Sequence, residues 1–306
     1  MSKLDLSVNI GNLKLRNPII LASGTVGYGS EISEFIDLKN IGAIVTKSIS
    51  LKPRKGNKPQ RILETSAGML NAIGLTNVGI EKFITEKIPY LKKQDVPIIC
   101  NIAASTIEEY VECVKILNSE DGIHAFEINV SCPNVKEGGL QFGNNEKMVG
   151  KITKEIRACT NKPIIIKLSP NVANISDFAE IAKEEGADSV SAINTLIGTA
   201  FNIKNRKPKL KNITGGLSGP AIKPIALAKI FEIHQKVKIP IIGIGGIMNW
   251  QDAVEFMIAG ASAIQLGTVN FIDPTASIKI LNGLTDYCKE NNIQKINSLT
   301  GSYQLD

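Results

Sequence analysis

The chain has 306 residues, of which 43% are hydrophobic and 21% are charged, and its formal net charge is +6. This composition is typical of a globular protein with a large apolar core, and no run of 18 apolar residues could form a membrane-spanning helix. The five cysteines form no CxxC pair and only two histidines are present, which argues against a disulfide framework, a metal site and a Ser-His-Asp triad. The N-terminus lacks the pattern of a signal peptide, so we expect a cytoplasmic protein.

Short apolar runs alternate with longer segments of helical periodicity along the chain. The short runs are apolar on both faces, as buried parallel strands are. They cover residues 18–22, 43–47, 97–101, 125–130, 163–168, 189–194, 240–243 and 263–266. Helical segments include residues 107–117, 176–185, 225–236, 250–259 and 276–290.

Eight strands alternating with helices predict a single (β/α)8 barrel domain over residues 1–306, a TIM barrel. The structural alternative is a doubly wound open sheet, but the glycines in residues 24–29 have the wrong spacing for a dinucleotide-binding fingerprint. Two extended loops, residues 48–75 and 196–219, leave the C-terminal ends of predicted strands, where lids and partner surfaces are usually built. The basic runs 52–61 and 204–211 within them indicate either an anionic partner or a solvated surface, and we favour the surface.

Polar side chains stand where the predicted strands end. The C-terminal ends of barrel strands meet at one mouth, so these side chains are expected to converge on a ligand. They are Ser23, Lys47, Ser48, Asn101, Asn129, Cys132, Lys167, Asn194 and Thr195.

Cys132 is the candidate for a reactive group, because it lies in the segment Asn129-Val-Ser-Cys-Pro-Asn134 directly after a predicted strand. A thiol has an ordinary pKa near 8.5, and amide donors or a cation nearby would help it ionise and act as a general base or nucleophile. The other four cysteines lack such neighbours and are expected to be inert.

Glycines close the last two predicted strands, at Gly245-Gly246 and at Gly267-Thr268. Glycine lets a phosphate approach backbone N–H groups, and this is the usual place for a phosphate in such a barrel. A phosphate site beside a ring of polar groups suits FMN, with Lys167 next to the pyrimidine end of the flavin.

These segments together resemble the class 1 dihydroorotate dehydrogenases, flavoenzymes of pyrimidine (UMP) biosynthesis. The matching segments, in order, are residues 17–24, 46–48, 71–75, 129–134, 193–195, 215–220 and 243–246. The resemblance implies that substrate is bound by Lys47, Asn71, Ala72, Ile73, Gly74, Leu75, Asn129, Asn194 and Thr195. It implies that FMN is bound by Ser23, Lys47, Ser48, Asn101, Asn129, Lys167, Ile193, Gly219, Gly245, Gly246, Gly267 and Thr268.

The resemblance also implies a reaction. Cys132 would remove the proton from C5 of (S)-dihydroorotate while hydride leaves C6 for flavin N5, giving orotate. The amino-acid sequence of residues 131–139 and 214–220 is similar to that of the NAD-linked subtype. In that subtype a homodimer of this chain would associate with two iron–sulfur flavoprotein subunits carrying FAD and a [2Fe-2S] cluster, which pass the electrons to NAD+. Lys58, Thr76 and Val78 differ from the residues that this subtype has in the same loops, and the resemblance assigns no catalytic role to any of them.

Three other functions agree with parts of the sequence. The fumarate-linked homodimeric subtype shares the cysteine motif, and only the sequence of the surrounding loops argues against it. A tRNA dihydrouridine synthase is also an FMN barrel with an active-site cysteine, and the +6 charge suits it. That family adds a helical RNA-binding domain, for which little chain follows the eighth helix, so neither nucleic acid nor a membrane is expected as a partner. A barrel that only binds a phosphorylated ligand would not need Cys132 and Lys167 together.

Overall fold

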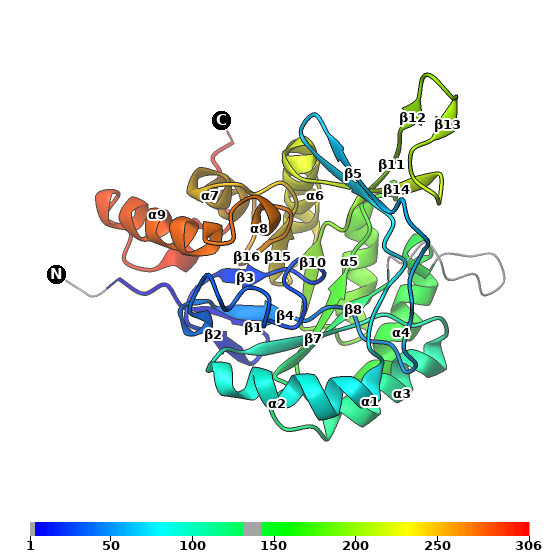
Figure 1. Ribbon diagram of the computed structural model, residues 1–306. Coiled ribbons are helices and arrows are strands. Elements are labelled where there is room, and N and C mark those ends of the chain that lie inside the picture. The colour runs from blue at the N-terminus through cyan, green and yellow to red at the C-terminus, as the bar shows by residue number, and fades with distance from the viewer. Residues whose placement is uncertain (1–3, 131–141, 306) are drawn as a thin grey trace.

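The computed structural model describes residues 4–130 and 142–305. Eight parallel strands form a closed barrel in the order in which they follow one another along the chain (Figure 1). They are β3 (Ile19–Leu21), β4 (Ala43–Val45), β7 (Ile98–Ile102), β8 (Ala125–Asn129), β9 (Ile164–Lys167), β10 (Ser189–Ala192), β15 (Ile241–Ile244) and β16 (Ala263–Leu266). The predicted (β/α)8 barrel is therefore confirmed, and every strand lies within two residues of its predicted bounds.

Helices surround the barrel (Figure 1). The longer ones are α3 (Ile107–Asn118), α4 (Glu146–Arg157), α5 (Ile175–Glu184), α6 (Lys223–Lys236), α7 (Trp250–Ile258) and α9 (Ala276–Glu290). The connection from β4 to β7 ends in a helical stretch made of α1 (Ile80–Lys82), a π-helical segment (Phe83–Lys87), α2 (Ile88–Leu91) and a 3₁₀ turn (Lys92–Gln94). Shorter pieces are α8 (Val269–Ile272) and 3₁₀ turns at Leu38–Asn40, Phe142–Asn144, Pro220–Ile222 and Ile296–Leu299. In the described part of the chain, none of the helices has the length and apolar character needed to cross a membrane.

Alternate residues of each strand face opposite sides of the barrel wall, because side chains in a strand alternate with period two. One set packs outward against the helices, as Phe126 and Ile128 of β8 do. The other set fills the barrel interior and includes Ile99, Ala125 and Ile165. The interior is thus a packed core and not a channel.

A hairpin of β1 (Val8–Ile10) and β2 (Leu13–Leu15) packs against the interior set. Its buried side chains Val8, Ile10 and Leu15 join the cluster that holds Ala43 and Ala125, the first residues of β4 and β8. The hairpin therefore covers the N-terminal end of the barrel.

The two predicted long loops form a second sheet at the other end (Figure 1). Its order is β11 (Leu196–Thr199), β14 (Thr214–Ser218), β6 (Gly68–Asn71) and β5 (Ile62–Thr65), and all its pairs are antiparallel. A Cβ at Gly68 would lie 2.0 Å from the Ser218 carbonyl oxygen, so this pairing needs glycine there. A further hairpin of β12 (Phe201–Asn202) and β13 (Lys207–Pro208) carries the exposed basic residues Lys204, Arg206 and Lys207, and the exposed Lys209 and Lys211 follow it.

Candidate active site

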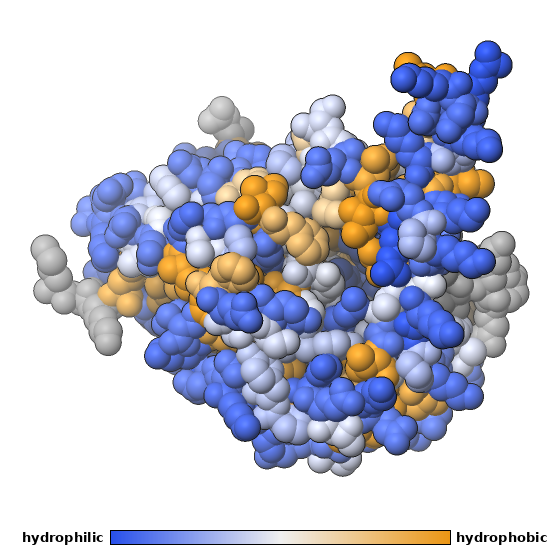
Figure 2. Space-filling view, viewed as in Figure 1, coloured by the Kyte–Doolittle hydropathy of each residue, from blue (hydrophilic) through white to orange (hydrophobic). Residues whose placement is uncertain are grey.

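A cavity of about 450 Å³ lies where the barrel strands end, beneath the antiparallel sheet. Its volume is within the usual range of ligand pockets, about 300–1,000 Å³. Figure 2 shows the hollow near the middle of this face, with apolar residues along part of its rim. Predicted site residues that line it are Ser23, Lys47, Ser48, Asn71, Ala72, Ile73, Leu75, Asn129, Lys167, Ile193, Asn194, Thr195, Gly219, Gly245, Gly246, Gly267 and Thr268. The structure therefore brings together residues from the ends of seven barrel strands and from strands β6 and β14 of the antiparallel sheet. This sheet of β11, β14, β6 and β5 is called the lid below.

Three predicted residues are placed differently or are not described. Gly74 lies beside the wall, where an added Cβ would come within 2.7 Å of the Asn57 nitrogen. Asn101 is fully buried behind Ser48, whose hydroxyl donates to its Oδ1 at 2.6 Å. Cys132 lies outside the described residues.

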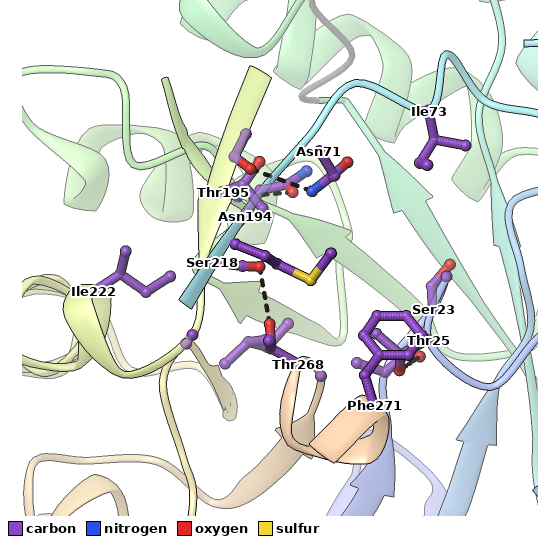
Figure 3. A pocket seen from close by; sticks show the side chains of 18 of the residues that line it. Ser23, Thr25, Asn71, Ile73, Asn194, Thr195, Ser218, Ile222, Thr268 and Phe271 are labelled. Atoms are coloured by element: carbon purple, nitrogen blue, oxygen red, sulfur yellow. Dashed lines mark hydrogen bonds between the residues drawn. The ribbon is translucent and has the colours of Figure 1, made fainter. Parts of the chain in front are cut away.

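Amide side chains form one side of the pocket (Figure 3). Asn194 donates from Nδ2 to Asn129 Oδ1 at 3.2 Å, and its own Oδ1 accepts from the Thr195 backbone N–H at 2.9 Å. Asn71 reaches across from β6 and donates to the Gly216 carbonyl at 3.3 Å. The backbone carbonyl of Asn129 accepts from the Tyr110 hydroxyl at 2.7 Å, which holds this strand end in place. These bonds hold the amides in fixed orientations, as recognition of a small polar ligand requires.

Glycines line the opposite side, where β15 and β16 end. Gly245 and Gly246 have φ values of +129° and +79°, which side-chain-bearing residues rarely adopt. A Cβ on Gly246 would lie 2.8 Å from the Lys223 backbone nitrogen, so both the backbone angle and the space require glycine. Thr268 donates to the Ser218 hydroxyl at 2.8 Å and so joins this side to the lid (Figure 3).

Two lysines give the pocket positive charge. Lys47 and Lys167 both line it, and Lys167 is only 7% exposed. The Lys167 ammonium lies 3.5 Å from Oε1 of Glu127, which is completely buried in the barrel interior. Cations beside a glycine cradle and several hydroxyl groups suit an anionic ligand. This donor set therefore fits the phosphate and the polar ring edge of FMN.

Several wall residues were not predicted from the sequence. Met69, Met248 and Phe271 supply apolar surface, while Arg61 and Ser218 add polar groups. None of them belongs to a polar motif directly after a barrel strand, and only such a motif marks a site residue in the sequence. Glu127 was also missed, although a carboxylate at an inward position of an apolar strand is itself a signal.

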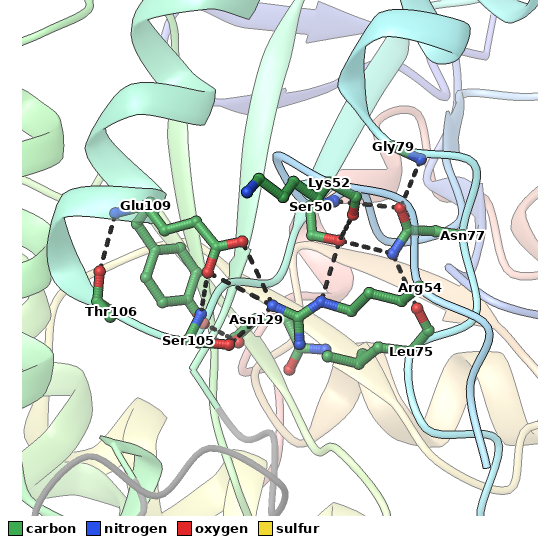
Figure 4. Close-up of polar contacts among 11 residues, drawn as sticks. Ser50, Lys52, Arg54, Leu75, Asn77, Gly79, Ser105, Thr106, Glu109 and Asn129 are labelled. Carbon is green, nitrogen blue, oxygen red and sulfur yellow. Dashed lines mark hydrogen bonds and ion pairs between the residues drawn. The ribbon is translucent and has the colours of Figure 1, made fainter.

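A polar network ties the segment before β5 to the helix after β7 (Figure 4). Arg54 donates to the Ser105 hydroxyl at 2.8 Å and lies 3.4 Å from the Glu109 carboxylate. Glu109 also accepts from the Ser105 backbone N–H at 2.6 Å, and its own N–H is capped by Thr106. Asn77 pairs with Arg54 through two backbone bonds of 3.1 and 3.0 Å. The wall segment at residues 71–76 is thereby anchored to the barrel.

Three of the four cysteines in the described part of the chain are buried core residues, whereas Cys159 is half-buried. Cys100 and Cys113 are buried, and that burial raises the pKa of each thiol to about 12. Burial also raises the pKa of the Cys288 thiol. At neutral pH these thiols stay protonated, in agreement with the expectation that they are inert.

Comparisons with known proteins agree with this site. A family model described as dihydroorotate dehydrogenase matches residues 5–287. A relative from Geotalea daltonii is 50% identical over 305 residues, which is 100% of both chains. Another from Thermoanaerobacter sp. (strain X514) is 50% identical over 303 residues, 99% of this chain and 100% of the relative. One from Bacteroides thetaiotaomicron is 48% identical over 301 residues, 98% and 99% of the two chains.

All three relatives bear the name dihydroorotate dehydrogenase B (NAD(+)), catalytic subunit. Both the family match and these identities extend over almost the whole chain, including every segment that lines the pocket. The chain therefore belongs to the dihydroorotate dehydrogenase family.

Proposed function

We propose that this chain is the catalytic subunit of an NAD+-linked dihydroorotate dehydrogenase, which oxidises (S)-dihydroorotate to orotate in pyrimidine biosynthesis in the cytoplasm. The observation that carries the proposal is the pocket in which the amides of Asn71, Asn129 and Asn194 face a glycine cradle, with Lys47 and Lys167 in its wall. Full-length identity of about 50% to catalytic subunits of that name supports it.

The cofactor proposed for this pocket is FMN. Gly245, Gly246, Gly267 and Thr268 would hold its phosphate, because glycine leaves backbone N–H groups accessible. Ser23, Ser48, Asn129, Lys167, Ile193 and Gly219 would surround the rest of the molecule, with Asn101 supporting Ser48 from behind. The chemistry that a bound FMN supplies is that of a hydride acceptor.

The chain's own residues bind the substrate and move its proton. Dihydroorotate is a carboxylate with a ring of amide groups, so Lys47 suits its charge and the three asparagines suit its ring. This part of the wall is completed by Thr195 and by the segment Asn71–Leu75, in which Gly74 alone lies behind the wall. We assign Cys132 as the base: its thiolate would take the proton from C5 of dihydroorotate as the bond from C6 to its hydride breaks. The antiparallel sheet over the mouth would limit the access of water.

Electrons are proposed to leave through a partner subunit. The relatives' names contain both NAD(+) and catalytic subunit, which supports a separate electron-transfer subunit. We propose that this partner carries FAD and a [2Fe-2S] cluster, and that two copies of each chain form a heterotetramer.

An anaerobic titration of the purified chain tests the proposal. We expect a yellow protein whose flavin absorbance is bleached by dihydroorotate. We further expect that neither fumarate nor NAD+ restores the colour until an iron–sulfur flavoprotein partner is added, after which NAD+ does. Rapid reoxidation by fumarate would instead show the homodimeric subtype, and a flavin that dihydroorotate fails to bleach would favour a dihydrouridine synthase.

A further inference from the structure

Glu127 is a carboxylate inside the barrel. It belongs to β8, where Phe126 and Ile128 pack outward and Ala125 packs inward, so the alternation directs Glu127 into the interior. Its side chain is 0% exposed. A buried charge of this kind is stable only when it is paired and hydrogen-bonded.

Four donors from four other strands surround this carboxylate. Asn101 Nδ2 donates to Oε1 at 2.6 Å, and the Lys167 ammonium lies 3.5 Å from the same oxygen. The Ser191 hydroxyl and Gln265 Nε2 donate to Oε2 at 2.9 and 2.7 Å. Both oxygens thus accept from two groups each, which is what an ionised carboxylate can do.

The network reaches the pocket wall at two points. Lys167 itself lines the pocket. Ser48, also in the wall, donates to Asn101 Oδ1 at 2.6 Å, and this bond fixes the Asn101 amide with its nitrogen toward Glu127. Glu127 does not line the pocket, so it makes no contact with a ligand itself and reaches one through these neighbours and through its charge.

The charge of Glu127 also offsets that of Lys167. In a buried site a carboxylate and an ammonium a few ångströms apart largely cancel each other's field at a ligand beyond them. Without Glu127, a ligand beside Lys167 would experience a stronger positive potential. The form of that ligand with more negative charge would then be favoured.

We infer that Glu127 is a positioning residue that holds Lys167 and, through Asn101, Ser48 at the pocket wall, and that its charge lowers the reduction potential of the bound flavin. The inference rests on the proposed FMN function. Reduction adds negative charge to the flavin, so removal of the Glu127 charge stabilises the reduced form relative to the oxidised form.

The test is the variant Glu127→Gln, which keeps the size of the side chain and removes its charge. We expect the ratio of the FMN dissociation constants, oxidised over reduced, to rise about tenfold, which for a two-electron couple equals a potential about 30 mV higher. The potential is measured by anaerobic equilibration with a redox dye, and the affinity of the stripped protein for oxidised FMN by fluorescence titration.

A matched control is Asp188→Asn. Asp188 also forms an ion pair, 2.9 Å from Arg157, but it immediately precedes β10 at the N-terminal end of the barrel. Its variant is expected to leave the flavin potential unchanged. If wild-type protein binds no FMN, the proposed function fails. If it binds FMN and the Glu127→Gln variant has the same potential as the Asp188→Asn variant, the inference about Glu127 is overturned.

Protein stability provides a second measurement, made without FMN. Glu127→Gln leaves Lys167 without this counter-charge, so it is expected to lower the unfolding temperature or prevent folding. Adding Lys167→Met to that variant is expected to recover part of the loss. The single variant Lys167→Met completes the cycle. If the losses of stability in the two single variants simply add in the double variant, the two charges are not coupled, and the inference is contradicted.

Discussion

In the proposed reaction, Cys132 removes the proton from C5 of dihydroorotate. We expect Cys132→Ala to retain FMN but to lose most turnover near neutral pH, since alanine cannot accept a proton. A general base contributes about 10²–10⁴-fold to a rate, so a loss of that size in kcat is expected.

Cys132→Ser serves as the second variant. A hydroxyl ionises at a much higher pH than a thiol, so its residual activity should rise toward alkaline pH beyond the point where the wild-type rate levels off. Turnover by Cys132→Ala at close to the wild-type rate would remove the base assignment. Steady-state kinetics from pH 6 to 10, with the flavin content checked by absorbance, separate these outcomes.

At the scale of single residues, most of the polar side chains predicted at strand ends do line one pocket. Lys47, Asn129 and Lys167 could be predicted, because the C-terminal ends of barrel strands always meet at one mouth. Met69 and Phe271 could not be predicted, since an apolar side chain in a loop carries no signal of what it will face. Gly74 follows the binding motif yet backs onto Asn57, a contact between loop segments that motif matching does not reveal.

At the scale of elements, Arg54 links the segment before β5 to helix α3. Arg54→Met removes its bonds to Ser105 and Glu109 and leaves the Asn71–Leu75 segment less firmly held. We expect the KM for dihydroorotate to rise severalfold, with a smaller change in kcat, because partly exposed ion pairs contribute only about 1 kcal/mol.

Two further variants sharpen this prediction. Arg54→Lys keeps the charge but lacks the guanidinium fork, so it should fall between the wild type and Arg54→Met. Arg16→Met removes a more exposed ion pair, with Asp95 3.6 Å away, and neither of these two residues lines the pocket. It should leave the KM unchanged. An Arg54→Met variant with the wild-type KM would show that the anchor does not position the substrate.

The barrel strands could be predicted from the sequence, while the lid sheet could not. Strands buried on both faces are continuous apolar runs, which is a local signal. The pairing of β14 with β6 joins residues about 145 positions apart, as between Gly216 and Asn71, and depends on glycines that look like ordinary loop residues. The long loops at residues 48–75 and 196–219 were recognised, but their pairing into one sheet was not.

At the scale of the whole molecule, the closed barrel predicts a single folding unit over residues 1–306. We expect one calorimetric unfolding transition, because strand β16 pairs with β3 and so joins the two ends of the barrel. Free FMN at 100 times its dissociation constant should add about 2.7 kcal/mol to the free energy of unfolding and raise the transition temperature. Two transitions, only one of them shifted by FMN, would contradict a single domain.

The hairpin β1–β2 has a consequence for the order of events in a catalytic cycle. Among the described residues, this hairpin and the packed interior close the N-terminal end of the barrel, whereas the cavity lies at the opposite end. Dihydroorotate and orotate must therefore pass through the same opening. Orotate must leave before the next substrate molecule can bind, so the product should act as a competitive inhibitor against dihydroorotate.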